Sequence, residues 1–185
     1  MDIQSMLNEF DNRELVALAR LDIEQNRVDH ALLKIKQVLK VDADNSEALI
    51  MGGKLFAQLH LYDKAKQFYQ QYLKNSHQAT IEKFEYGMLH FDSNQIDDAL
   101  QIWAEVLEVE PLSPPTLFYK GLAHAQKGEF EKSRECLNRL MQSAPADNLY
   151  FGKAKELLTQ LNQDQSNEDV NNNLQLAKNA YKTIN

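Results

Sequence analysis

The chain has 185 residues, of which 43% are hydrophobic and 25% are charged, and these proportions are typical of a folded soluble protein. Its 20 basic and 27 acidic residues give a net charge of −7, which argues against a general binder of nucleic acid or of anionic membranes. One cysteine, Cys136, excludes an internal disulfide and a CxxC zinc site. No apolar stretch approaches the roughly 18 residues of a membrane span, and the N-terminus does not resemble a signal peptide. We therefore expect a cytoplasmic protein.

A period of 34 residues organises most of the sequence. After a short segment, residues 1–11, we predict four tandem units at 12–45, 46–79, 80–113 and 114–147, followed by a terminal segment at 148–185. Three sets of equivalent positions keep the spacing without an insertion: Ala19, Gly53, Gly87 and Gly121; Ala31, Ala65, Ala99 and Ser133; Val28, Tyr62, Ile96 and Phe130. Such regularity is the signature of a repeat architecture.

Each unit is predicted to form two helices. In the unit 80–113, apolar residues from Ile96 to Leu107 recur at spacings of three and four, the pattern of an amphipathic helix. The fifteenth position of the four units holds Asn26, His60, Asn94 and Gly128. Gly, Asn and His readily adopt the left-handed conformation that ends a helix, so we expect a sharp turn in the middle of each unit.

Both ends of the chain are predicted to cap the repeats, because stacked repeats need terminal elements with one polar face. Residues 1–11 carry a short apolar stripe of Ile3, Met6, Leu7 and Phe10. Residues Leu149 to Leu161 continue the pattern of a first helix. A further helix is predicted near the C-terminus, where one stripe gathers Val170, Leu174, Ala177, Tyr181 and Ile184. Either end could instead contact a neighbouring molecule.

These positions resemble the motif of the tetratricopeptide repeat family. The motif places a large apolar residue at the fourth position of a unit (Leu15, Leu49, Leu117), small residues at the eighth and twentieth, and a large residue at the twenty-fourth (Ile35, Tyr69, Trp103, Leu137). Lys83 departs from it at the fourth position of its unit. The resemblance implies an all-α fold, a right-handed superhelical solenoid of stacked helix-turn-helix repeats whose first helices line a concave groove.

The groove positions implied by this resemblance are mostly apolar or aromatic in the middle units. We expect a protein-binding surface made of Ile50, Met51, Lys54, Ile81, Phe84, Glu85, Met88, Phe91, Phe118, Tyr119 and Leu122. A subclass of the family binds acidic chaperone tails through a carboxylate clamp of Lys, Asn and Arg side chains. The matching positions here include Val16, Met51 and Ile81, which cannot hold a carboxylate, so we reject that function.

The sequence offers no convincing catalytic, cofactor or metal site. It contains no phosphate-binding loop, HExxH motif or Gly-x-Ser-x-Gly motif. Asp97 and Asp98 lie at a predicted helix start, where acidic residues are stabilising, and Cys136 is interpreted as a packing residue. His90 and His124 share the eleventh position of consecutive units. Because this position normally belongs to the core and no third ligand accompanies them, we predict no metal there.

The leading hypothesis is a non-catalytic protein-interaction module, an adaptor, scaffold or chaperone-like protein that holds a peptide or helix of another protein in its groove. The alternative is a self-associating protein whose groove is filled by its own tail or by a second copy, so homo-oligomers are possible. A secretion-type chaperone is a minor alternative. We expect neither nucleic acid nor membrane as a partner. The sequence does not identify the partner protein.

Overall fold

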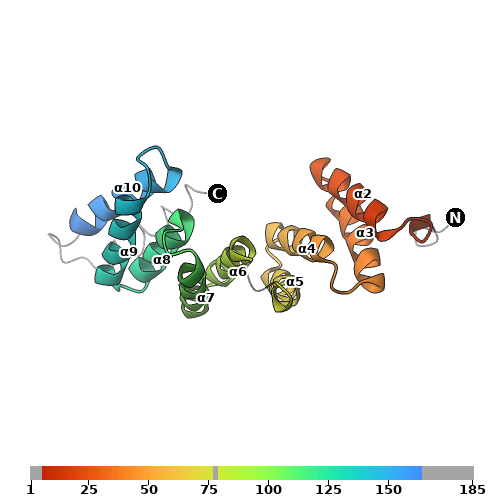
Figure 1. The fold of residues 1–185 in the computed structure, drawn as a ribbon, viewed down its shortest axis with the longest axis horizontal. Coiled ribbons are helices and arrows are strands. Elements are labelled where there is room, and N and C mark those ends of the chain that lie inside the picture. The colour runs from red at the N-terminus through yellow and green to blue at the C-terminus, as the bar shows by residue number, and fades with distance from the viewer. Residues whose placement is uncertain (1–5, 77–78, 164–185) are drawn as a thin grey trace. The chain divides into compact units, whose positions relative to one another are not determined.

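The computed structural model describes residues 6–76 and 79–163, and within them it contains nine helices and no strand (Figure 1). In chain order these are α2 (Asn12–Glu24), α3 (Val28–Val41), α4 (Ser46–Gln58), α5 (Tyr62–Lys74), α6 (Thr80–Asp92), α7 (Ile96–Val109), α8 (Pro114–Gln126), α9 (Phe130–Ser143) and α10 (Leu149–Gln163). The predicted all-α fold of paired helices is confirmed. Ile3 of the N-terminal stripe and the C-terminal helix predicted around Val170 to Ile184 lie outside the described residues.

The 34-residue period of the sequence reappears in the helix boundaries. Helices α2, α4, α6 and α8 begin at residues 12, 46, 80 and 114, and their partners begin at 28, 62, 96 and 130. The chain forms two compact units, Met1–Ser93 and Asn94–Asn185. The boundary between them lies in the turn between α6 and α7, inside the predicted repeat 80–113.

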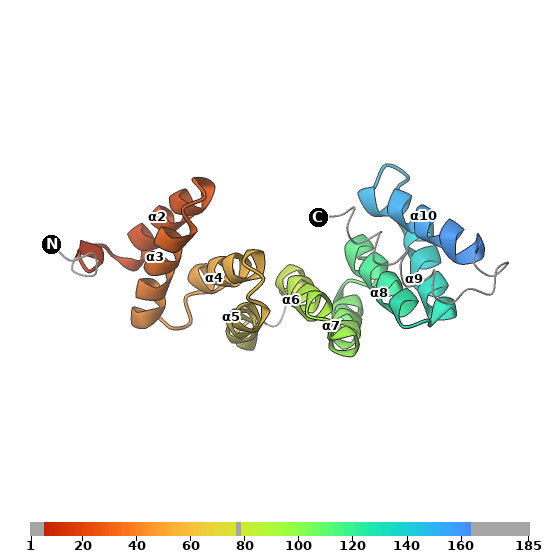
Figure 2. The same cartoon turned by 180° about the vertical axis from the view of Figure 1, so that it is seen from behind.

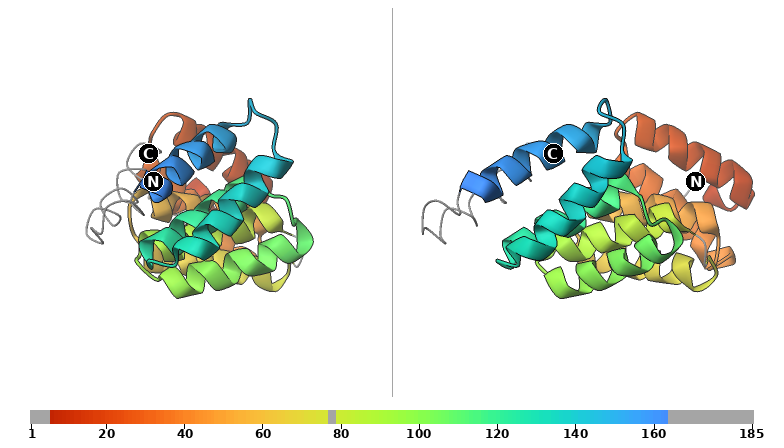
Figure 3. Two further views of the ribbon diagram at one scale, coloured as in Figure 1. Left: turned by 90° about the vertical axis from the view of Figure 1, so that its left-hand side faces the viewer. Right: turned by 60° about the vertical axis from the view of Figure 1, so that its left-hand side comes forward.

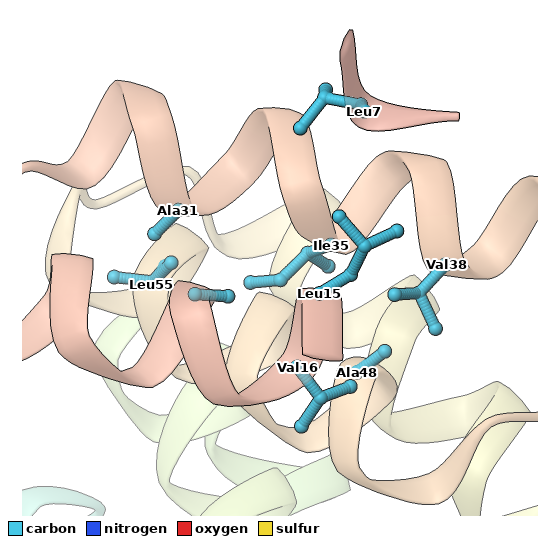
Figure 4. Packing of buried hydrophobic residues seen from close by; sticks show 9 residues of the cluster. Leu7, Leu15, Val16, Ala31, Ile35, Val38, Ala48 and Leu55 are labelled. Atoms are coloured by element: carbon cyan, nitrogen blue, oxygen red, sulfur yellow. The ribbon is translucent and has the colours of Figure 1, made fainter. Parts of the chain in front are cut away.

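The first unit is a sequence of helices that each pack against the next, from α2 to α6. Its larger core cluster joins α2, α3 and α4 around Leu15, Ile35 and Val38, and Leu7 of the predicted N-terminal stripe is buried in it (Figure 4). A second cluster, around Phe56 and Tyr69 among others, joins α4, α5 and α6. Burial of each such side chain contributes about 1.5–3 kcal/mol, so consecutive helices stabilise one another.

The second unit consists of α7 to α10. Helix α8 packs against α7 and α9, and α10 packs against both α9 and α8 (Figure 2). In Figure 3, α10 in blue lies beside α9 in teal. The core contains Trp103, Leu117, Leu122, Leu137 and Leu140, each at most 1% exposed. Helix α10 therefore packs against the last helix pair, α8 and α9.

The turns within the helix pairs have the predicted left-handed geometry. Asn26, His60 and Asn94 have φ angles of 56°, 56° and 62°, and Gly128 has a φ of 75°. Only Gly, Asn, Asp and His adopt this region at modest cost. The fifteenth position of each unit therefore reverses the chain between α2 and α3, α4 and α5, and α8 and α9, and it also forms the turn before α7.

Hydrogen bonds define where the helices begin and end, as both ends of α2 show. Beyond α2, the amide of Arg27 donates to the carbonyl of Asp22 at 2.7 Å, the long bond that closes a Schellman-type helix end. At the start of α2, the Asp11 side chain accepts from the amide of Glu14, and the Glu14 side chain accepts from the amide of Asp11. This reciprocal capping satisfies two amides that the helix leaves unpaired.

Small residues bring the two helices of a pair close together. A Cβ atom placed on Gly53 would lie 2.7 Å from Cε2 of Tyr69, and one placed on Gly121 would lie 3.0 Å from Cγ and Cδ2 of Leu137. Both distances are shorter than an ordinary carbon–carbon contact of roughly 3.5–4.0 Å. These glycines are kept in helices, at a propensity cost of about 1 kcal/mol each, because the opposing large side chain occupies the space of a Cβ.

Replacing Gly121 with leucine is expected to lower the free energy of unfolding by about 1–3 kcal/mol, because the added side chain overpacks the contact with Leu137. Gly152 of α10 is a matched control, since a Cβ there meets nothing within 4 Å. Gly152→Leu should be neutral or stabilising through its better helix propensity. Chemical denaturation followed by circular dichroism measures both, and equal effects would contradict the proposed contact.

Ser133 faces the same contact and buries a hydroxyl. The side chain is fully buried, and its Oγ has no hydrogen-bond partner among the described residues. Equivalent positions in the other units hold Ala31, Ala65 and Ala99, all fully buried. Because an unsatisfied buried hydroxyl costs about 1–3 kcal/mol, Ser133→Ala should raise the free energy of unfolding by about 1 kcal/mol. The exposed Ser143→Ala is the control, and a destabilised Ser133→Ala protein would contradict this reasoning.

Candidate functional site

The first unit holds eight of the predicted groove residues, on α4 and α6. Ile81 is 67% exposed, while Ile50, Met51, Phe84 and Met88 are half-buried. Phe91 is buried, and the two charged members, Lys54 and Glu85, are exposed and half-buried respectively. Apolar side chains are thus accessible on the first helices of this unit, with Ile81 the most open of them.

Charged side chains link neighbouring first helices on this surface. The Lys54 Nζ lies 3.0 Å from Oε1 of Glu85, joining α4 to α6, and Arg20 Nη2 lies 3.2 Å from Oε1 of Glu47, joining α2 to α4. Such exposed pairs contribute little to stability, with a median of about 0–1 kcal/mol. They place a cation and a carboxylate at defined positions beside the apolar side chains.

Glu85 has a second partner in the tyrosine of the neighbouring helix. The Tyr69 hydroxyl of α5 donates to Oε2 of Glu85 at 2.8 Å. Burial raises the pKa of Tyr69, and the adjacent Glu85 carboxylate raises it further, so the hydroxyl stays protonated and remains a donor. Glu85 therefore accepts from both Lys54 and Tyr69, which fixes its orientation between α4, α5 and α6.

The three groove residues predicted in the second unit lie in its core. Phe118, Tyr119 and Leu122 of α8 are at most 5% exposed. The ring centroid of Tyr150, on α10, lies 5.8 Å from that of Phe118 and 6.3 Å from that of Tyr119. The ring centroid of Trp103, on α7, also lies 6.0 Å from that of Tyr119. Helix α10 therefore covers the rings of Phe118 and Tyr119, and Leu122 is buried in the core of the same unit.

Tyr150 was not among the predicted site residues, although the sequence carried a signal for it. The first-helix pattern from Leu149 to Leu161 implies a further helix after α9, and the structure packs this helix, α10, against α8 and α9. Tyr150 lies at the start of that helix, and its ring contacts the aromatic side chains of α8. Aromatic pairs at such distances are worth about 0.5–1.5 kcal/mol beyond the area they bury.

The two histidines of the eleventh position have separate environments in their own units. His90 packs edge-on against Tyr86, with ring centroids 4.7 Å apart and an interplanar angle of 89°. His124 Nδ1 lies 2.7 Å from Oε2 of Glu129. Hydrogen bonds from His124 and Lys132 lower the pKa of Glu129 to about 2, so at neutral pH the carboxylate accepts and Nδ1 of His124 carries the proton.

The sequence did not predict that the carboxylate of Asp22 is buried. Asp22, on the last turn of α2, is 2% exposed and accepts from Arg27 Nη2 at 2.6 Å and from Lys34 Nζ at 2.5 Å. Burial alone would raise its pKa, but the hydrogen bonds from Lys34 and Arg27 outweigh burial and hold the pKa below its ordinary value. Asp22 thereby ties the end of α2 to α3 and has a structural role.

In residues 6–76 and 79–163, no helix combines the length and apolar character needed to cross a bilayer. No group of three His, Cys, Asp or Glu side chains in the same residues is arranged to hold a metal ion.

The helix pairs, their left-handed turns and their glycine contacts can be compared with known proteins. A family model described as tetratricopeptide repeat matches residues 16–80 and 85–148, well over half of the chain. The chain belongs to the tetratricopeptide repeat family. No curated protein sequence matches it.

Solved structures share the tetratricopeptide repeat fold at low sequence identity. MamA 41-end from Desulfovibrio magneticus RS-1 is 18% identical, with a TM-score of 0.74, over 95% of this chain and 94% of that one. A double mutant of MamA RS-1 is 16% identical, with a TM-score of 0.75, and the match covers 94% of this chain and 96% of that one. A tetratricopeptide repeat protein from Parabacteroides merdae ATCC 43184 is 17% identical, with a TM-score of 0.73, and the match covers 94% of this chain and 64% of that one. At these identities the likeness concerns the fold alone.

Proposed function

We propose that this tetratricopeptide repeat protein is a non-catalytic interaction module, a scaffold or adaptor that binds an extended or helical segment of another protein. The binding surface is the first-helix face of α4 and α6, made of Ile50, Met51, Lys54, Ile81, Phe84, Glu85 and Met88. The observation that carries the proposal is the exposure of Ile81 among half-buried apolar neighbours. Exposed apolar surface that is contiguous and rimmed by charges often marks a protein interaction site.

The chemistry of this surface suits an apolar segment that also carries charge. Methionines adapt to irregular partners because their side chains are unbranched and flexible, and Met51 and Met88 supply two of them. The Lys54–Glu85 pair at 3.0 Å presents both signs beside the apolar side chains. Charges at the rim of an interface steer orientation and association rate more than affinity.

A second candidate is self-occupation, in which the chain covers its own first-helix surface. One observation favours it, because α10 already covers Phe118 and Tyr119 of α8 through Tyr150. In this version residues 164–185, or a second copy of the chain, would occupy the equivalent surface of α4 and α6. The two candidates differ in whether the occupant belongs to the same protein.

Site-specific photo-crosslinking distinguishes these candidates. A photoreactive phenylalanine analogue replaces Ile81, and matched positions are Val41, 71% exposed on α3, and Leu112, 57% exposed between α7 and α8. We expect position 81 to give a crosslink to a different protein in cells, and positions 41 and 112 to give little or none. All three positions are exposed, so the substitutions should leave the thermal unfolding midpoint nearly unchanged.

The crosslinked peptides decide the outcome. Products of position 81 that contain residues 164–185, or any other segment of this chain, would establish self-occupation in place of a partner protein. Equal yields of foreign protein from positions 41, 81 and 112 would contradict a binding surface on α4 and α6.

A further inference from the structure

The second unit contains a pocket of about 220 Å³, and its lining shares no residue with the proposed binding surface of α4 and α6. It lies among α7, α8 and α9, on the side of α8 that carries Leu117, Lys120 and His124. These residues are spaced three and four apart and so share one face of the helix, whereas Phe118 and Tyr119 contact Tyr150 of α10. Lys132, Cys136 and Arg139 form the facing stripe of α9.

The pocket gathers positive charge in a protein of net charge −7. Lys120, Lys132 and Arg139 line it together with one carboxylate, Glu135. Lys132 is engaged by Glu129 at 3.2 Å. In residues 6–76 and 79–163, no ion pair engages Lys120 or Arg139. Two cationic groups are therefore available to an anion from outside.

The electrostatic influence of these cations reaches the buried side chains of the pocket. Burial raises the pKa of the Cys136 thiol, and Lys120 and Arg139 both oppose that shift, while Glu135 adds to it. Burial lowers the pKa of His124, and Lys120 and Lys132 lower it further, against its hydrogen bond to Glu129. Positive charge thus acts on both groups from α8 and from α9.

Part of the pocket lining is apolar. Leu107 of α7 and Leu117 of α8 line the pocket beside the cations, and Leu117 is 1% exposed. A carboxylate alone would not contact this wall, but a carboxylate on a short hydrocarbon stem would meet both kinds of surface. Arginine suits the anionic end because its planar guanidinium can donate two parallel hydrogen bonds to a carboxylate.

We propose that this pocket binds a carboxylate carried on an apolar stem, with Lys120 and Arg139 contacting the carboxylate and Leu107 and Leu117 contacting the stem. The carboxylate could belong to the C-terminus of a peptide or to a free aliphatic acid, since both present the same chemistry. The site does not depend on the first-helix surface of α4 and α6, and occupation of one does not require the other.

Cys136 provides the assay, because it is the one cysteine of the chain and lines the pocket. The full-length protein is alkylated with iodoacetamide at pH 8.5 and constant ionic strength, and the rate is followed by intact mass. The probes are N-acetyl-Ala-Ala-Leu with a free carboxylate, the same peptide as its C-terminal amide, and 4-methylpentanoate. We expect at least one of the two acids to slow alkylation saturably, and the amide to have no effect.

The effects of the two acids identify the source of the ligand. A lower half-saturating concentration for the peptide acid assigns the site to a protein C-terminus, and a lower one for 4-methylpentanoate assigns it to a free acid. Absence of protection by both acids, or equal protection by the amide, would overturn the proposal.

Charge variants test the residues named. The double variant Lys120→Gln with Arg139→Gln should raise the half-saturating concentration about tenfold or more, the factor expected for loss of a charge-assisted hydrogen bond. Lys40→Gln with Lys155→Gln removes the same charge from exposed positions outside the pocket and should change nothing. Glu135→Gln, an exposed change, should lower the half-saturating concentration by removing repulsion. Identical behaviour of all three variants would contradict the assignment.

Discussion

Replacing Phe118 with alanine is expected to lower the free energy of unfolding by about 3–5 kcal/mol, the usual cost of truncating a buried aromatic side chain. Phe118 is 1% exposed, and its ring contacts those of Tyr119 and Tyr150, with centroids 5.4 and 5.8 Å away. The truncation would leave a cavity between α8 and α10 that neither helix can fill without moving. A side chain in an open groove could be truncated with little loss of stability, but Phe118 is covered by α10.

The sole tryptophan makes this measurement specific to the second unit. Trp103 is fully buried and lies 6.0 Å from Tyr119, so its fluorescence reports unfolding of the residues around α8. Leu112→Ala is the control in the same unit, because Leu112 is 57% exposed and loses much less buried area. If Phe118→Ala and Leu112→Ala have similar denaturation midpoints, Phe118 is not buried under α10 as described.

Replacing Asp22 with asparagine is expected to cost about 3 kcal/mol of stability. Breaking a buried ion pair by removing one partner typically costs about 3–5 kcal/mol, and the lower end applies because the Arg27 side chain is 49% exposed. Asparagine keeps the size of the side chain but carries no charge, so it cannot form ion pairs with the two cations. The exposed Asp29→Asn, on α3, should change stability by less than about 0.5 kcal/mol.

The contribution of Asp22 should also depend on pH in a defined direction. Its folded-state pKa is lower than the ordinary value of 3.8, so the unfolded state binds the proton more tightly. The stabilisation is therefore fully present above pH values near the ordinary pKa, and it declines as the pH falls toward the folded-state pKa. The difference in stability between wild type and Asp22→Asn should shrink in acid, and a difference that grows as the pH falls would contradict this role.

The sequence predicted the fold more completely than the site, and particular residues show why. Asn26, His60, Asn94 and Gly128 have conformational preferences that act locally, so their spacing alone predicted the turns. The accessibility of Phe118 depends on which helix covers α8. That depends on tertiary packing, because it is Tyr150 of α10 that contacts Phe118.

The ion-pair network of Asp22 was missed for a related reason. Asp22 and Lys34 are charged residues on amphipathic helices, and Arg27 lies in the turn between them. In sequence all three resemble solvated surface positions. Whether a charged side chain is buried depends on how α2 ends against α3, because the turn after Asp22 brings Arg27 and Lys34 toward it. No periodic pattern in the sequence predicts that Arg27 and Lys34 come close to Asp22.

The order of helix contacts has a consequence for how fast each unit acquires its structure. In both units, nearly every substantial contact joins helices that follow each other directly, such as α2 with α3 and α8 with α9; the exceptions, α8 with α10 and α2 with α4, skip a single helix. The polypeptide loops closed by these contacts are short, so little chain entropy is lost before the contacts form. Proteins of such low contact order complete folding in about microseconds to milliseconds. Each unit should therefore spend little time with its apolar helix faces uncovered after leaving the ribosome.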